Sequence, residues 1–251
     1  MTVLKVEKLN LWYGHRKVLQ DVSFEVGEGE VLCIVGQSGS GKSSILYSIL
    51  GLLPPHARVE GSIYLMGDDL RKLGRKEMRE IRGRKIGMVF QEPSSYLDPL
   101  FTVGIQISET LFAHFSKSAE EVRERTLKAM RRVGIPEPEK KYGMYPHQLS
   151  GGLKQRVCIA MATVCEPKLL LADEPTTALD VSVQKRILAL FRKIRSEGRS
   201  IVLVTHDFGV VAEVGDRVLV LKEGKVVEEG SVYDIFDHPQ DPYTRELLAA
   251  I

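Results

Sequence analysis

The chain has 251 residues, of which 43% are hydrophobic and 27% charged, a composition typical of a soluble globular protein. Its 35 Lys and Arg residues against 33 Asp and Glu residues leave a net charge of only +2, which argues against nucleic acid as the main partner. No segment approaches the roughly 18 consecutive apolar residues that span a bilayer, and the first residues lack the apolar core of a signal peptide. We therefore expect a cytoplasmic protein that reaches a membrane only when another chain holds it there.

The three cysteines, Cys33, Cys158 and Cys165, are interpreted as small buried hydrophobic residues. A structural zinc or iron–sulfur site would need four ligands at close spacing, and this pattern is absent from the sequence. An odd number of cysteines also fits a reducing compartment.

In chain order, residues 1–30 alternate apolar and polar side chains, which predicts antiparallel strands with a turn near Gly14. The apolar run 31–35 predicts a strand buried on both faces. A helix from about residue 41 to 53 follows it and stops before two prolines. Residues 61–90 predict further strands around a basic polar segment.

From about residue 92 to 165 the pattern becomes helical, and Ser118 begins a capping-box sequence for a helix that ends near Gly134. Strands and helices then alternate again. The predicted elements of this part are a strand at 169–172, a helix at 183–197, a strand at 201–204 and a hairpin at 218–229 that turns at Glu223-Gly224. Such alternation implies a parallel sheet with helices on both faces, so 92–165 is predicted to be a helical insertion into an α/β core.

A glycine-rich loop follows the strand 31–35 and has the sequence Gly36-Gln37-Ser38-Gly39-Ser40-Gly41-Lys42-Ser43. It fits the pattern G-x-x-x-x-G-K-[ST] between a strand and a helix, a context that makes a chance glycine turn the weaker alternative. Glycines let backbone N–H groups curl around a phosphate, and the next helix points its positive end at the same anion. Lys42 can reach the β- and γ-phosphates of a nucleotide, and the Ser43 hydroxyl can ligate Mg²⁺.

Two carboxylates, Asp173 and Glu174, follow the buried strand 169–172. Asp173 stands where a partner for Mg²⁺ is needed, and Glu174 can orient or polarise an attacking water. Taken alone, the pair would be interpreted as a solvated strand end. The glycine-rich loop in the same chain favours the catalytic interpretation.

A second anion site is predicted at Ser150-Gly151-Gly152, which precedes a helix containing Gln155. The simple alternative is an N-cap. Because the two phosphate-binding helix ends lie far apart in the chain, we expect two surfaces to grip one nucleotide, and these surfaces could belong to two subunits.

Three further residues have plain alternatives. Gln91 follows a predicted strand and could be a polar strand end, His206 follows another and could cap the next helix, and Tyr13 could simply pack on the sheet instead of stacking on a base.

Taken together and in this order, the motifs resemble the nucleotide-binding subunit of an ATP-binding cassette (ABC) transporter over nearly the whole chain. The part most specific to that family is Ser150–Gln155, which resembles its signature although Leu153 and Lys154 stand where a glutamine often follows. The segment Thr177-Ala178-Leu179-Asp180 resembles its D-loop, with Thr177 where serine is commoner.

The resemblance implies an α/β fold, in which a P-loop NTPase core with a parallel sheet carries an N-terminal antiparallel β-subdomain and an inserted helical subdomain. The core and β-subdomain are expected in residues 1–91 and 166–251 of this single ABC ATPase domain, and the helical subdomain with the signature in about 92–165.

The resemblance also implies roles for single residues. Tyr13 would stack on adenine, Gln91 would ligate Mg²⁺ and sense the membrane subunit, and His206 would contact the γ-phosphate. The residues expected to bind ATP are Tyr13, Gly36, Gln37, Ser38, Gly39, Ser40, Gly41, Lys42, Ser43, Ser44, Gln91, Ser150, Gly151, Gly152, Gln155 and Asp180. Those expected to hold Mg²⁺ are Ser43, Gln91 and Asp173, and those expected to act in hydrolysis of ATP are Glu174, His206, Lys42 and Gln91.

Two segments, Gln91–Pro99 and His238–Leu248, resemble the importers of peptides and nickel, the second through its "HPxxPYT" ending. The expected cargo is a peptide or a related solute such as nickel or an oligosaccharide. Many peptide-type members continue with a cysteine-containing tail that binds an iron–sulfur cluster. This chain ends at Ile251 without one, which leaves open a short member, as nickel-type subunits are, or a truncated chain.

The implied partners are two membrane permease subunits, a second ATP-binding subunit with a heterodimer favoured over a homodimer, and an extracytoplasmic solute-binding protein. They would place the chain at the cytoplasmic face of the cell membrane as a peripheral subunit. One rival is a soluble ABC-type ATPase of translation or DNA maintenance, which usually has two cassettes or a long coiled-coil insertion. Another is a non-catalytic nucleotide sensor, in which Asp173 or Glu174 would be missing. The sequence has neither a second cassette nor a long coiled coil, and both carboxylates are present.

Overall fold

The computed structural model describes residues 1–177 and 179–249. It shows an α/β fold made of two compact units, one formed by Met1–Met78 and the described residues from Phe191 onward, the other by Arg79–Leu190. No helix in the described part of the chain has the length and apolar character needed to cross a membrane. The predicted boundaries at 91/92 and 165/166 remain a prediction.

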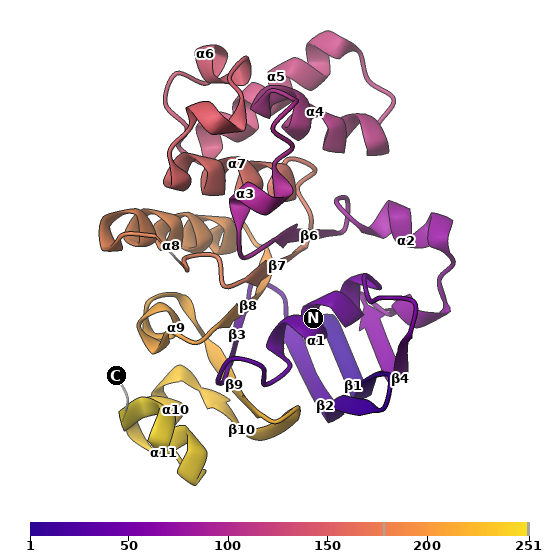
Figure 1. Ribbon diagram of the computed structural model, residues 1–251, viewed down its shortest axis with the longest axis vertical. Coiled ribbons are helices and arrows are strands. Elements are labelled where there is room, and N and C mark those ends of the chain that lie inside the picture. Colours follow the sequence, from indigo (N-terminus) through magenta and orange to yellow (C-terminus); the bar gives the residue numbers. More distant parts are fainter. Residues whose placement is uncertain (178, 250–251) are drawn as a thin grey trace. The chain divides into compact units, whose positions relative to one another are not determined.

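An antiparallel sheet with the strand order β2-β1-β4-β5 forms the N-terminal part of the first unit (Figure 1). Its strands are β1 (Thr2–Tyr13), β2 (Arg16–Gly27), β4 (Ala57–Leu65) and β5 (Asp68–Asp69). Tyr13 pairs with Arg16 across the turn, where Gly14 has a φ of 57°. Buried Val22, Phe24 and Val26 alternate with exposed residues along β2. The antiparallel strands and their turn are therefore confirmed.

The other strands of the first unit follow the order β10-β9-β3-β8. They are β3 (Val31–Val35), β8 (Ser200–Thr205), β9 (Arg217–Lys222) and β10 (Lys225–Ser231). Strand β3 runs parallel to β8 and β9 and is buried along its whole length, as predicted. The β9–β10 hairpin turns at Glu223 and Gly224, whose φ angles are 46° and 78°. The helices of this unit are α1 (Lys42–Leu50), the 3-10 helix η1 (Leu70–Lys72), α9 (Phe208–Val214), α10 (Val232–Asp237) and α11 (Pro242–Ala249).

Helix α1 is shorter than expected. It ends at Leu50 and not at Leu53, because Gly51 takes the left-handed conformation (φ 59°) and its N–H bonds back to the carbonyl groups of Ser48 and Tyr47. The two prolines that follow favour a later end of the helix, but the left-handed Gly51 ends it first.

In the second unit, strands β6 (Ile86–Val89) and β7 (Leu169–Asp173) pair in parallel. The helices between them are α3 (Pro93–Tyr96), α4 (Val103–His114), α5 (Ala119–Arg132), α6 (Pro138–Tyr142), the 3-10 helix η2 (Pro146–Gln148) and α7 (Gly151–Thr163). The points at which the chain passes between the units lie in α2 (Arg75–Ile81) and α8 (Val181–Ser196).

A capping hydrogen bond fixes the start of one helix of this unit, and a cluster of hydroxyl groups connects three of its helices. Ser118 caps α5 by accepting a hydrogen bond from the Glu121 N–H (3.2 Å), which confirms the predicted helix start. The Ser108 hydroxyl lies 3.0 Å from both the Thr126 and the Tyr142 hydroxyls, so it joins α4 to α5 and α6, which Figure 1 shows side by side.

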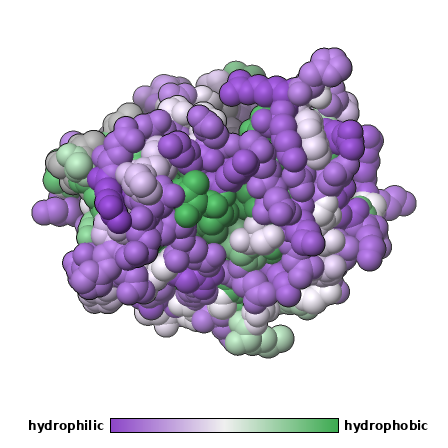
Figure 2. Space-filling model, turned by 90° about the horizontal axis from the view of Figure 1, so that it is seen from below, coloured by the Kyte–Doolittle hydropathy of each residue, from purple (hydrophilic) through white to green (hydrophobic). Residues whose placement is uncertain are grey.

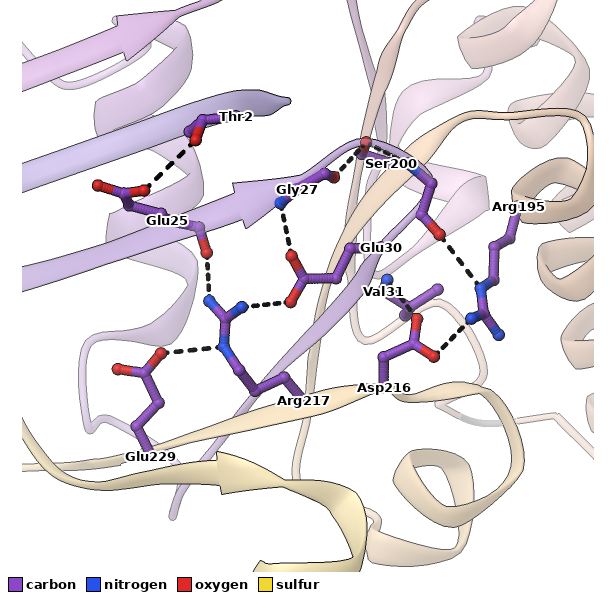
Figure 3. A network of polar contacts seen from close by, with 11 residues as sticks. Thr2, Glu25, Gly27, Glu30, Val31, Arg195, Ser200, Asp216, Arg217 and Glu229 are labelled. Atoms are coloured by element: carbon purple, nitrogen blue, oxygen red, sulfur yellow. Dashed lines mark hydrogen bonds and ion pairs between the residues drawn. The ribbon is translucent and has the colours of Figure 1, made fainter.

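A network of polar contacts links the two groups of strands within the first unit (Figure 3). Arg217 on β9 forms ion pairs with Glu30 and with Glu229 (Nε–Oε1 3.0 Å), and it donates to the backbone carbonyl of Glu25 on β2. Asp216 accepts from the Val31 N–H (2.9 Å) through one carboxylate oxygen, and the other pairs with an arginine of α8 (2.6 Å).

The Arg217→Ala variant is expected to lower the free energy of unfolding by about 1–3 kcal/mol, because Glu30 would then be left half-buried without its cation. Urea unfolding of the full chain would measure this change. Arg58→Ala is the control, since the Arg58–Glu60 pair is exposed and its loss should cost less than about 1 kcal/mol. Equal effects of the two substitutions would show that Arg217 has no special structural role.

Candidate functional site

The glycine-rich loop connects β3 to α1, as predicted. Gly36, Gly39 and Gly41 have φ angles of 154°, 79° and 105°, which L-residues with a side chain rarely adopt. Space is restricted as well, because a Cβ at Gly36 would lie 2.2 Å from the Leu221 carbonyl oxygen and one at Gly41 would lie 2.8 Å from Leu19 Cδ2. The glycines of the motif are therefore required by the backbone path itself.

The loop has the properties of a phosphate cradle. No side chain caps the N-terminus of α1 and its first turn holds no acidic residue, so the positive end of the helix is directed at the loop. The Lys42 side chain is only 5% exposed, and its ammonium group donates to the carbonyl oxygens of Gly36 (2.7 Å) and Gln37 (2.9 Å). The buried Ser40 Oγ has no hydrogen-bond partner among the described residues. A ligand with several anionic oxygens fits these groups.

Tyr13 and His206 also lie in the first unit. The Tyr13 hydroxyl lies 3.4 Å from Ser44 Oγ in α1, which places the ring beside the phosphate cradle. His206 is exposed between β8 and α9, and it is Asp207 that caps α9, by accepting from the N–H groups of Gly209 (2.7 Å) and Val210 (3.4 Å). The capping role considered for His206 is thus filled by its neighbour.

In the second unit, Gln91 and Glu174 follow the paired strands β6 and β7 and lie in contact. Gln91 Nε2 donates to Glu174 Oε2 (3.1 Å), and the Thr177 hydroxyl donates to the same oxygen (2.9 Å). Glu174 has a φ of 42°, which is a strained value for any residue other than glycine. Backbone strain of this kind is often found at functional sites. Asp173, the residue before Glu174, is buried at the end of β7. The hydrogen bonds from Gln91 and Thr177 together hold the Glu174 carboxylate in one orientation.

The contact from Thr177 was not predicted from the sequence. The available signal was a hydroxyl three residues after the glutamate, and the Thr177 N–H does bond to the Glu174 carbonyl (3.2 Å) in a turn. Ala178 of the predicted D-loop lies outside the described residues. Asp180 accepts from Ser182 Oγ (2.7 Å) and the Val183 N–H (3.0 Å) at the start of α8, and these hydrogen bonds hold the pKa of its carboxyl below the usual value.

The signature segment forms the start of α7. Ser150 occupies the N-cap position, yet its side chain makes no capping hydrogen bond and the first turn holds no acidic residue. The simple alternative to an anion site, in which the Ser150 hydroxyl caps the helix, is therefore not what the structure shows. A Cβ at Gly151 would meet nothing within 4 Å, whereas one at Gly152 would lie 2.7 Å from Val183 Cγ1. Gln155 lies in the core, where its Nε2 donates to the Pro175 carbonyl (2.7 Å) just after Glu174.

Oxygen donors of the kind that Mg²⁺ prefers occur at all three predicted metal positions: a hydroxyl at Ser43, an amide at Gln91 and a carboxylate at Asp173. The chemistry of this set fits Mg²⁺.

Comparison with known proteins agrees with these features. The family model described as ABC transporter matches residues 19–177. The dipeptide transport ATP-binding protein DppD of Bacillus subtilis is 47% identical over 99% of this chain and 76% of its own length. The oligopeptide transport ATP-binding protein OppD of the same organism is 47% identical over 95% of this chain and 67% of its own length. A solved dimeric ATP-binding cassette in a post-hydrolysis state, with ADP and phosphate bound, superposes with a TM-score of 0.81 at 35% identity and covers 91% of this chain and 98% of its own. The chain belongs to the ABC transporter family, as one of its ATP-hydrolysing subunits.

Proposed function

We propose that this subunit powers the uptake of peptides, or of a related solute, through separate permease subunits in the membrane. The observation that carries the proposal is the 47% identity to a dipeptide transport protein over 99% of the chain, which extends through the "HPxxPYT" segment. A strain in which the Glu174→Gln variant replaces the chain should lose uptake of a labelled dipeptide. Normal dipeptide uptake combined with lost uptake of nickel or of an oligosaccharide would identify a different cargo.

The first unit supplies the groups that bind the phosphates. Lys42 would turn from the carbonyl oxygens of Gly36 and Gln37 to the β- and γ-phosphates, and the loop N–H groups would donate to them. Tyr13 would stack on the base, and His206 would donate to the γ-phosphate. Ser43 of this unit, and Gln91 and Asp173 of the second unit, are the residues proposed to hold Mg²⁺, which would supply positive charge beside the phosphate oxygens.

The second unit supplies the group that acts on water. Glu174, oriented by the amide of Gln91 and the hydroxyl of Thr177, would accept a hydrogen bond from the attacking water and polarise it. Because Gln91 donates to the catalytic carboxylate, a movement of the segment after β6 would change the orientation of Glu174. This contact is a means by which a partner subunit could control hydrolysis.

We propose that the Ser150 surface completes the nucleotide site of a second ATP-binding subunit. The uncapped N-terminus of α7 and the hydroxyl that is not used as a cap fit a γ-phosphate. Asp180 would contribute at the same interface, and Gln155 would position the segment after Glu174. The dimeric state of the similar cassette that holds ADP and phosphate supports this arrangement. A heterodimer with a related chain remains the favoured assembly.

The contact with the permease is proposed for a sequence cluster of exposed apolar side chains in the second unit. Its members follow Gln91 in the chain and are Tyr96, Leu100, Phe101, Ile105 and Phe112. Large apolar side chains exposed along one segment of the chain are candidates for burial against a protein partner. The face shown in Figure 2 is mainly hydrophilic, with an apolar area near its centre and smaller apolar areas toward its edges.

The Leu100→Asp and Phe101→Asp variants should each lose co-purification with the permease while the isolated chain keeps its ATP affinity. Leu100 is 78% exposed, so a carboxylate there leaves the fold intact but opposes burial against an apolar partner. The control is Tyr233→Asp on α10, where the side chain is 79% exposed. Retention of the permease by both cluster variants would rule out this surface.

A further inference from the structure

The C-terminal "HPxxPYT" segment is held firmly on β10 of the first unit. Glu228 accepts hydrogen bonds from the backbone N–H groups of Gln240 (2.7 Å) and Asp241 (3.1 Å), and Asp241 caps α11 by accepting from the Tyr243 N–H (2.8 Å). Burial acts to raise the pKa of the Glu228 carboxyl, but the donors from Gln240 and Asp241 leave it below the usual value. Arg245 donates back to the carbonyl oxygens of Pro239 (2.9 Å) and Gln240 (3.1 Å).

Tyr243 extends from this segment to the phosphate-binding loop. Its ring is 4% exposed and lies under the Lys222 ammonium group, 4.7 Å from the ring centroid. Its hydroxyl oxygen accepts a hydrogen bond from the backbone N–H of Gln37 (3.0 Å), the second residue of the loop. This contact joins residues 206 positions apart in the chain.

The β9–β10 turn holds the loop at a second point. The Gly224 N–H donates to the Ser40 carbonyl (2.9 Å), and Gly224 is confined by the Val18 carbonyl, which a Cβ would approach to 2.0 Å. The two anchor points, Gln37 and Ser40, lie on either side of Gly39, where a Cβ would meet nothing within 4 Å. The loop is thus fixed at both sides by elements from the C-terminal part of the chain, and open in the middle.

We propose that Tyr243 is a positioning residue for the nucleotide, because its hydroxyl fixes the start of the phosphate-binding loop in the shape that receives the phosphates. A loop already held in its binding shape loses less conformational freedom on binding, so affinity rises. The linkage is reciprocal, and bound nucleotide should in turn stabilise α11. This inference rests on the proposed assignment of the loop to the phosphates of ATP.

The test uses the full chain and a fluorescent N-methylanthraniloyl derivative of ATP with Mg²⁺. The Tyr243→Phe variant removes one hydroxyl and keeps the ring under Lys222, so its dissociation constant should rise about fivefold, the effect of one lost neutral hydrogen bond. Its melting temperature without nucleotide should fall by no more than about 4 °C, the shift expected from one lost hydrogen bond in a chain of this length. Tyr233→Phe on exposed α10 is the matched control and should change neither value.

A second readout follows α11 directly. Nucleotide should slow amide hydrogen exchange in residues 243–249 of the unmodified chain and of Tyr233→Phe, but not of Tyr243→Phe. Equal dissociation constants for the two Phe variants would overturn the proposal. A weaker affinity of Tyr243→Phe accompanied by a fall in melting temperature of more than about 4 °C would overturn it as well. Lys42→Ala separates this inference from the proposed site: if that variant binds the nucleotide normally, the assignment of the loop itself is wrong.

Discussion

Glu174→Gln is expected to lower the rate of ATP hydrolysis by about 10²–10³-fold while ATP still binds. The amide keeps the size of the side chain and can still accept a hydrogen bond from Gln91 or Thr177, so the local structure should persist. It loses the negative charge that polarises the attacking water. Steady-state phosphate release gives the rate, and equilibrium binding of ATP with Mg²⁺ gives the affinity.

Glu166→Gln is the matched control for this substitution. Glu166 is an exposed glutamate of the second unit and, like Glu174, has a left-handed backbone (φ 57°), and its side chain lies 3.7 Å from an arginine of α5. Turnover of this control should stay within about twofold, since the loss of a surface ion pair has little effect. If Glu174→Gln hydrolyses ATP as fast as the control, Glu174 has no catalytic role.

Ser150→Arg should abolish ATP-dependent association with a second ATP-binding subunit, whether a copy of this chain or a related one, and reduce turnover by at least about 10²-fold with it. The isolated chain should still bind ATP, because the phosphate cradle lies in the first unit. The arginine would place a long cation at the start of α7, where the structure leaves an uncapped helix N-terminus suited to an anion. Light scattering with and without ATP measures the association.

Ser118→Arg provides the comparison, because Ser118 is also the N-cap of a helix in the second unit and its hydroxyl does cap α5. This variant should lose about 1 kcal/mol of stability and keep ATP-dependent association. Loss of ATP binding by the isolated Ser150→Arg chain would contradict the model in which two subunits share one nucleotide.

Local sequence signals predicted the parts of the fold that depend on a few neighbouring residues. The glycine-rich loop, the β9–β10 turn at Glu223-Gly224 and the start of α5 at Ser118 all follow from backbone angles or hydrogen bonds within a few positions. The end of α1 was predicted wrongly because two possible stops, Gly51 and the prolines, compete, and only the observed left-handed glycine decides between them. The basic polar segment between the strands of 61–90 proved to contain α2, a short helix without a strong apolar repeat.

The contacts around the candidate site were harder to predict, because they depend on tertiary packing. Parallel strand ends suggested that residues after β6 and β7 meet, but the donation from Gln91 to Glu174 required the structure. The signature sequence likewise does not predict that Gln155 is buried and donates a hydrogen bond to the Pro175 carbonyl. The contact between Tyr243 and Gln37 joins segments from opposite ends of the chain and has no local signal at all.

We propose that this chain binds ATP on its glycine-rich loop and cleaves it with the help of Glu174. The most direct test is to identify the nucleotide that the Glu174→Gln variant retains after prolonged incubation with ATP and Mg²⁺. We expect intact ATP on the variant and ADP on the unmodified chain, as the catalytic role of Glu174 requires. ADP on the variant, formed as fast as on the unmodified chain, would contradict it.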